Sequence, residues 1–176
     1  PMPTAVEPSN GEDTMSVIIK PSEIERSSMG IIETELQERG ITLAPEQESV
    51  VKRVIHTTAD FDYAVNLAFS EGAVEKALEA LRSGCDIVTD TQMAKSGINK
   101  AAAEKLGCAV HCFMSDPDVA AEAKERGCTR AKVSMEKAAR VAGSGIFAIG
   151  NAPTALIMLR EMIEEGRISP KLVVGV

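Results

Sequence analysis

The chain has 176 residues, 44% of them hydrophobic, which is enough to build one ordinary domain with a proper core. Its formal net charge of −7 at pH 7 argues against nucleic acid or an anionic membrane as its partner, because both need a cluster of positive charge. No apolar run approaches the roughly 20 residues of a membrane span, and the N-terminus lacks the apolar core of a signal peptide. The sequence therefore predicts a cytoplasmic protein.

The two ends of the chain differ in character. Residues 1–14 are rich in proline, serine, asparagine, glycine and acids, so we expect a disordered arm there and a single domain over residues 15–176. The last six residues, KLVVGV, have the composition of a strand. A domain rarely ends flush with a core strand, and we expect a further C-terminal segment that this chain lacks.

Two helices are expected before the first strand. Ser22 and Glu25 form a capping-box pattern, and an apolar stripe then continues to Gly40. A second helix is expected to open near Pro45. Its last turn is polar and would carry His56.

From residue 63 on, apolar runs alternate with amphipathic helical patterns. This order predicts a parallel central sheet with helices on both faces, a three-layer α/β/α domain with right-handed crossovers. The expected strands are YAVNLAFS (63–70), CDIVTD (85–90), CAVHCFM (108–114), GIFAIG (145–150) and KLVVGV (171–176). The expected helical segments are 71–84, 91–107 (helical or looped), 116–127, 134–143 and 151–166.

Ligands in such domains bind beyond the carboxyl ends of the strands, where Asp90 and the turn 150–154 are expected. Gly150 allows a tight turn, Asn151 can cap a helix, and Pro153 suits its first turn. Backbone N–H groups at such a helix start attract carboxylates or phosphates, so we expect this turn to hold a carboxylate of the ligand. The alternative is an ordinary capped turn, since no dinucleotide or P-loop glycine pattern is present.

Other candidate residues lie outside that turn. His56 is one of two histidines and lies beside Thr57 in a polar turn, where an imidazole could act as a general acid; the alternative is a histidine that only caps or packs. Arg26 and Ser27, near the start of the first helix, and Arg130 are candidate anion contacts or else solvated surface groups.

The cysteines do not suggest a metal site or a disulfide framework. On a strand, Cys108 and Cys112 would lie about 13 Å apart on one face, with His111 pointing to the other. Metal bonds of about 2.0 to 2.3 Å exclude a joint site. We therefore expect free thiols and no metal site.

Several segments together resemble the precorrin-8X methylmutases, also called cobalt-precorrin-8 methylmutases, of cobalamin biosynthesis. The resemblance runs in order from about residue 24 to residue 176 without large gaps. The segments that carry it are IERS (24–27), RVIHTTADFDYA (53–64), LAFSEGAVEKALEALRSGCDIVTDTQMAKSGI (67–98), GCTRAKVS (127–134) and AIGNAPTAL (148–156).

The resemblance implies a flavodoxin-like fold, a homodimer, and an isomerase that moves a methyl group from C-11 to C-12 of a tetrapyrrole. The substrate would be precorrin-8X or cobalt-precorrin-8, the product hydrogenobyrinate or cobyrinate, and no cofactor is implied. His56 matches the catalytic acid of the family. The substrate-binding residues expected on this basis are Ser27, Arg26, Thr57, Met93, Arg130, Asn151 and Thr154, with Lys95 and Lys100 as further donors.

The chain departs from the family pattern in two places. Arg130 is followed by Ala131, where many members have serine, and members continue past the strand expected at 171–176.

A non-catalytic flavodoxin-like or receiver-like binding or signalling module is the alternative function. A flavin binder uses aromatic rings to sandwich the cofactor, and 3% aromatic residues with Tyr63 as the one tyrosine are poor material. A receiver-like domain needs a tight acidic cluster with a lysine, which Asp60, Asp62, Asp90 and Asp116 leave open.

Overall fold

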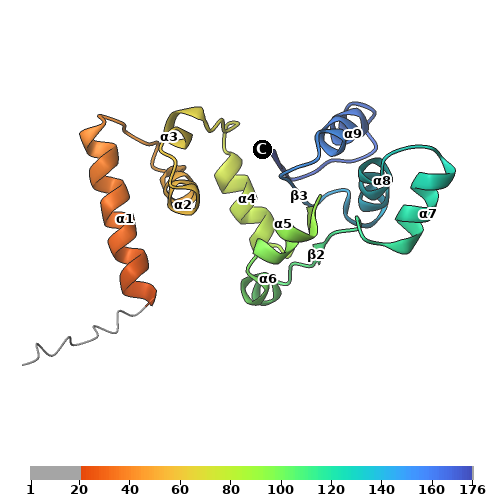
Figure 1. The fold of residues 1–176 in the computed structure, drawn as a ribbon, viewed down its shortest axis with the longest axis horizontal. Coiled ribbons are helices and arrows are strands. Elements are labelled where there is room, and N and C mark those ends of the chain that lie inside the picture. The colour runs from red at the N-terminus through yellow and green to blue at the C-terminus, as the bar shows by residue number, and fades with distance from the viewer. Residues whose placement is uncertain (1–20, 176) are drawn as a thin grey trace, which may run out of the picture. The chain divides into compact units, whose positions relative to one another are not determined.

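A computed structural model describes the chain over residues 21–175 (Figure 1). These residues fall into two compact units, one ending at Leu67 and the other beginning at Ala68, and each is described by itself. The arm predicted over residues 1–14 lies outside the described residues, and a single domain over 15–176 stays a prediction.

The first unit is helical. It consists of α1 (Pro21–Glu38), α2 (Glu48–Thr58) and the short α3 (Tyr63–Asn66). Helices α1 and α2 pack together, and their buried apolar side chains are Ile32, Leu36, Val51 and Ile55. Both helices were predicted, and the end of α1 just before Gly40 follows from the glycine's left-handed φ of 68°.

The second unit contains a four-stranded parallel sheet within the described residues, in the order β2-β1-β3-β4. Its strands are β1 (Ile87–Thr89), β2 (Val110–His111), β3 (Ile146–Ile149) and β4 (Leu172–Gly175). Its helices are α4 (Ala73–Arg82), α5 (Gln92–Gly97), α6 (Lys100–Leu106), α7 (Pro117–Glu125), α8 (Arg130–Ala142) and α9 (Pro153–Glu164).

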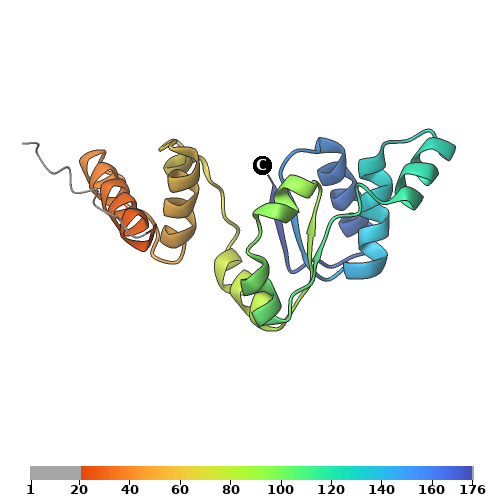
Figure 2. The same cartoon turned by 60° about the horizontal axis from the view of Figure 1, so that its bottom comes forward.

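Helices cover both faces of this sheet. Val88 and Phe147, which are paired in register, belong to a core cluster with α7, α8 and α9. Ile87 points the other way and packs with Ala103 of α6 and Leu81 of α4. Figure 2 shows the same division, with the green helices on one side of the strands and the blue helices on the other. The predicted three-layer α/β/α fold is confirmed.

One predicted strand is wrong. Residues 63–70 form no strand, because α3 occupies Tyr63–Asn66. The N–H of Asp62 donates to Asp60 Oδ1 at 2.9 Å, and the N–H of Asn66 donates to the Asp62 carbonyl at 3.0 Å. The backbone groups here are thus bonded within a local helical turn and not to a neighbouring strand.

Helix α8 begins earlier than expected. The sequence predicted a start at residue 134, but the helix begins at Arg130. Thr129 Oγ1 accepts the N–H of Lys132 at 3.2 Å and caps the helix, which therefore begins four residues upstream of the prediction.

Candidate functional site

The strand order places a topological switch point between β1 and β3. The chain leaves β1 towards β2 and leaves β3 towards β4, so the two connections depart in opposite directions. The carboxyl ends of such a strand pair are the usual ligand-binding position in open α/β sheets. We call the residues that follow the two strands here, 90–93 and 150–154, the switch-point edge.

Asp90 joins the two halves of the switch-point edge. Its side chain is only 2% exposed, and it follows β1 directly. Its Oδ1 accepts the N–H of Gly150 at 3.1 Å, and its Oδ2 accepts the N–H groups of Asn151 and Ala152 at 2.8 and 2.9 Å. This carboxylate therefore holds the turn after β3 against the end of β1.

These bonds correct one expectation. The N–H groups of residues 150–152 are not free to bind a ligand carboxylate, because they already donate to the side chain of Asp90. The side chains of Asn151 and Thr154 are exposed on either side of Pro153, the first residue of α9. They stay predicted substrate contacts through their side chains.

Met93 projects from the other half of the switch-point edge and is 86% exposed. The segment beneath it is anchored, because the buried Thr89 hydroxyl donates to the Thr91 carbonyl at 3.0 Å. Thr91 Oγ1 in turn accepts the N–H of Ala94 at 3.1 Å and caps α5. A thioether held out on a fixed segment is suited to contact with an apolar ligand face.

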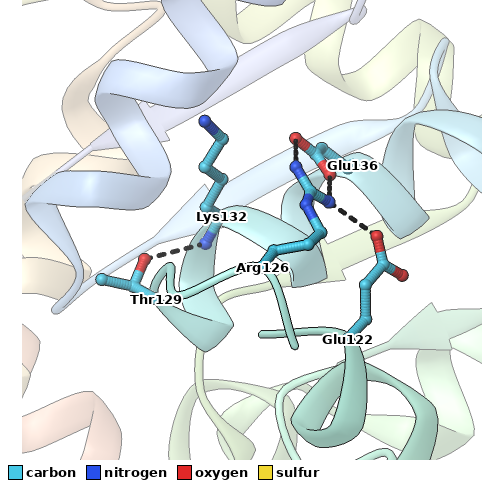
Figure 3. A network of polar contacts seen from close by, with 5 residues as sticks. All are labelled: Glu122, Arg126, Thr129, Lys132 and Glu136. Carbon is cyan, nitrogen blue, oxygen red and sulfur yellow. Dashed lines mark hydrogen bonds and ion pairs between the residues drawn. The ribbon is translucent and has the colours of Figure 1, made fainter. Parts of the chain in front are cut away.

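Arg130 is the exposed first residue of α8. Another arginine, Arg126, takes part in a network of polar contacts (Figure 3). Arg126 donates to Glu122 at 2.6 Å and binds both carboxylate oxygens of Glu136. Its hydrogen bonds lower the pKa of Glu136. Within residues 21–175 the Arg130 guanidinium has no such carboxylate partner, so it remains available for an anion.

Two lysines predicted as further donors line a cavity of about 240 Å³ next to β2. Lys95 of α5 and Lys100 of α6 share its wall with Glu104 and the buried Cys108. The glutamate offsets part of the positive charge, which makes this a weaker anion site than two lysines alone would give.

His56 lies in the last turn of α2, as predicted, and its side chain is exposed. Next to it, the hydroxyl of Thr57 donates to the Arg53 carbonyl at 2.9 Å. The helix ends at Ala59, whose φ of 56° lies in the left-handed region. The location of His56 is therefore confirmed, and its catalytic role stays a prediction.

Arg26 and Ser27 are exposed near the start of α1, beside Glu25. Glu25 Oε1 accepts a hydrogen bond from Arg53 Nη2 at 2.6 Å. This bond and the charge of Arg53 lower the pKa of Glu25, and the charge of His56 lowers it further. The start of α1 and the second half of α2 thus form one polar surface of the first unit.

The part of the chain from 21 to 175 shows no helix long and apolar enough to cross a membrane, and no cluster of three potential metal-binding side chains. Of the cysteines once considered as ligands, Cys108 is buried and donates its thiol to the Leu81 carbonyl at 3.3 Å. Cys112 is buried as well, and all four cysteines are free thiols.

A family model described as precorrin-8X methylmutase matches residues 23–176. The chain belongs to the precorrin-8X methylmutase family. The cobalt-precorrin-8 methylmutase of Priestia megaterium is 44% identical over 157 residues, which are 89% of this chain and 69% of that protein. The enzyme of the same name from Leptospira interrogans is 41% identical over 155 residues, which are 87% of this chain and 70% of that protein.

A solved structure agrees with this result. The precorrin-8X methylmutase from Thermus thermophilus superimposes with a TM-score of 0.78 at 36% identity, covering 88% of this chain and 75% of that one. This methylmutase is accordingly an isomerase of cobalamin biosynthesis, and the non-catalytic flavodoxin-like or receiver-like alternative is set aside.

The sequence did not reveal the bonding role of Asp90. Its partners are 60 to 62 residues further along the chain, and the pairing of β1 with β3 brings them together. The available signal was an aspartate directly after a buried apolar strand, facing a turn rich in backbone donors. That signal becomes specific only once the strand order is known.

Proposed function

We propose that this methylmutase converts cobalt-precorrin-8 to cobyrinate by moving a methyl group from C-11 to C-12 of the macrocycle. The family match over residues 23–176 carries this proposal. Four relatives with 39% to 44% identity are named cobalt-precorrin-8 methylmutases, whereas the relative from Pseudomonas aeruginosa named precorrin-8X methylmutase is 35% identical. These names support a cobalt-containing substrate over the metal-free one.

His56 is the proposed general acid. It would donate a proton to a pyrrole-ring nitrogen and so draw electrons from the conjugated system. The bond from the methyl group to C-11 then breaks as the bond to C-12 forms, in a 1,5-sigmatropic shift, and the proton returns when the product ring system is restored. An exposed imidazole in a polar helix turn supports this role, because imidazole is effective in proton transfer near neutral pH.

Substrate binding is assigned to side chains that suit the carboxylates and the ring of the macrocycle. The guanidinium groups of Arg26 and Arg130 would pair with peripheral carboxylates of the macrocycle, in the charge-assisted bonds that arginine forms well. Met93 would contact an apolar part of the ring. The remaining assigned contacts, all hydrogen-bonding side chains, are Ser27, Thr57, Asn151 and Thr154.

We also propose that the two units act as a single methylmutase domain, in a cytoplasmic homodimer. The family match supports the single domain, because it continues across the boundary at Leu67. Ile24 and Ile31 support the dimer: they lie seven residues apart on one face of α1 and are 52% and 66% exposed. An apolar face of this kind is suited to a second copy.

The reaction itself can be tested by spectroscopy. Purified enzyme is mixed with cobalt-precorrin-8 or with precorrin-8X, and the visible spectrum is followed as the conjugated system changes. We expect faster conversion of the cobalt form. A faster reaction of the metal-free form would overturn the choice of substrate, and no change with either would overturn the proposed function.

Binding can be tested by titration with cobyrinic acid. Removing a charged hydrogen bond costs about 1.5–3 kcal/mol, so Arg130→Ala should weaken affinity about 10- to 100-fold. Arg140→Ala removes an exposed arginine near the other end of α8 and should leave affinity unchanged. Equal effects of the two changes would contradict the assignment of Arg130.

A further inference from the structure

We propose that Asp90 is a positioning residue of the methylmutase: its buried carboxylate fixes the turn after β3 and thereby sets the positions from which Asn151 and Thr154 contact the substrate. This inference rests on the proposed function, in which those two side chains bind the macrocycle. Asp90 itself would not touch the substrate, because it is only 2% exposed.

The buried carboxylate of Asp90 is bonded to backbone groups of a single turn. Within residues 21–175 its hydrogen-bond partners are three successive backbone N–H groups, and no lysine or arginine pairs with it. Burying a carboxylate is costly unless its oxygens are bonded. The three donors satisfy that need, and they tie the carboxylate to one particular turn.

The helix that follows explains why the turn needs support from outside. Helix α9 has Ala152 as its N-cap residue, and no side chain of its own segment caps it. An alanine methyl group cannot accept the N–H groups that a helix start leaves unpaired. Asp90 accepts N–H groups immediately before α9 from the end of another strand, and its negative charge also suits the positive end of the helix dipole.

The positions of the candidate contacts depend on these bonds. Asn151 donates its own backbone N–H to Asp90 at 2.8 Å, so the bonded group and the proposed substrate contact belong to the same residue. Thr154 lies four positions after Gly150 and two after Ala152, the other two donors, and starts α9 with Pro153. If the turn relaxed, both side chains would move relative to the end of β1, and a displacement of about 1 Å at a site can reduce the rate 10²-fold.

Asp90→Asn tests the proposal. The amide has one oxygen in place of two and turns an N–H₂ group towards backbone donors, so at least one bond is lost and a repulsion is gained. We expect a weaker affinity for cobyrinic acid, a higher KM, and a loss in kcat/KM of about 10²-fold, measured per folded molecule. Met162→Ala is the matched control, because it opens the core under α9 at a fully buried side chain far from the turn.

A double-mutant cycle separates positioning from general stability. Asn151→Ala should weaken cobyrinic acid binding about 3- to 10-fold in the wild-type background, the usual effect of one hydrogen bond. In the Asp90→Asn background the same change should have almost no effect, because Asn151 is no longer held in place. In the Met162→Ala background, Asn151→Ala should weaken binding by the same factor as in the wild-type background. Additive effects of Asp90→Asn and Asn151→Ala would overturn the proposal.

Ala152→Pro approaches the same bonds from the other side and is the second variant if Asp90→Asn does not fold. It removes one N–H that Asp90 accepts and leaves the carboxylate in place, and it also forces the φ of residue 152 from −105° towards the proline value of about −65°. In this background too, Asn151→Ala should have almost no effect on the affinity for cobyrinic acid. A roughly 3- to 10-fold loss, as in the wild-type background, would overturn the proposal. Failure of the proposed function is distinguishable, since the unmodified enzyme would then neither convert cobalt-precorrin-8 nor bind cobyrinic acid.

Discussion

The two units carry their candidate residues in different ways. In the first unit the described buried side chains are the four apolar residues of α1 and α2, and every candidate residue is exposed. In the second unit Thr89, Asp90 and Ser134 are polar and buried. Thr89 and Asp90 form hydrogen bonds with the backbone of the segments that carry the exposed candidates Met93 and Asn151.

This difference predicts different responses to mutation. Where a candidate side chain projects from a helix surface, its removal should change chemistry and leave stability nearly intact. Where an exposed candidate depends on a buried polar group, mutation of that buried group should have the larger effect. It should lower stability and binding affinity together. The following predictions are designed to break or sharpen this contrast.

The largest effect is expected at His56. His56→Ala should reduce turnover by about 10²- to 10⁴-fold, the usual contribution of general acid catalysis, while affinity for cobyrinic acid and the melting temperature stay close to those of the unmodified enzyme. Steady-state kinetics and a binding titration on folded protein measure both quantities. Ser49→Ala, at an exposed position in the first turn of α2, is the control. Near-normal turnover of His56→Ala would mean that the histidine only caps or packs.

The second test compares two buried hydroxyls of the second unit. Thr89 donates to carbonyl oxygens of Thr91 and His111, whereas Ser134 has no hydrogen-bond partner among the described residues. Thr89→Val should cost about 1 kcal/mol of unfolding free energy in urea. Ser134→Ala should cost nothing and can add up to about 1 kcal/mol, because alanine also favours the helix. A larger loss for Ser134→Ala would show that its hydroxyl is bonded.

A smaller effect is expected at the end of α2. Ala59 has a φ of 56°, a conformation that strains residues with a side chain and favours glycine. Ala59→Gly should therefore stabilise the protein by about 0.5–1 kcal/mol in urea unfolding. Ala77→Gly, inside α4, should instead cost about 1 kcal/mol. Destabilisation by both changes would mean that Ala59 is not strained.

The smallest effect concerns the polar surface of the first unit. Arg53 lowers the pKa of Glu25 below its ordinary value of 4.5, so the pair stabilises the folded state above that pH and loses this contribution as the pH falls through the lowered pKa. Glu25→Gln should have a slightly lower melting temperature than the unmodified protein at pH 6 in low salt. This difference should shrink as the pH falls below 4.5 through the lowered pKa, and it should vanish in 1 M salt. Glu46→Gln is the exposed control. A difference that neither shrinks as the pH falls nor vanishes in 1 M salt would point to packing and not to charge.

Much of the fold could be predicted from local patterns. The apolar periodicity of α1 and α2 placed His56 in a final helical turn, and four apolar runs were recognised as β1 to β4. The prediction failed at Tyr63–Asn66, where the residue types suit a strand but the bonds of Asp60 and Asp62 start a helical turn. A short apolar run can form either a strand or a helix. Whether it becomes a strand depends on a neighbouring strand with which it can pair, and the local sequence does not show this.

The sequence by itself determined the residue types of the candidate site and the family to which the chain belongs, because both depend on the order of side chains along the chain. The tertiary structure alone decided what the turn at Gly150 to Ala152 does. Its N–H groups were expected to hold a ligand carboxylate, and they bind Asp90 because the parallel pairing of β1 with β3 brings a residue 60 positions away to the same end of the sheet. Hydrogen bonds between distant segments depend on strand order, which no local pattern contains.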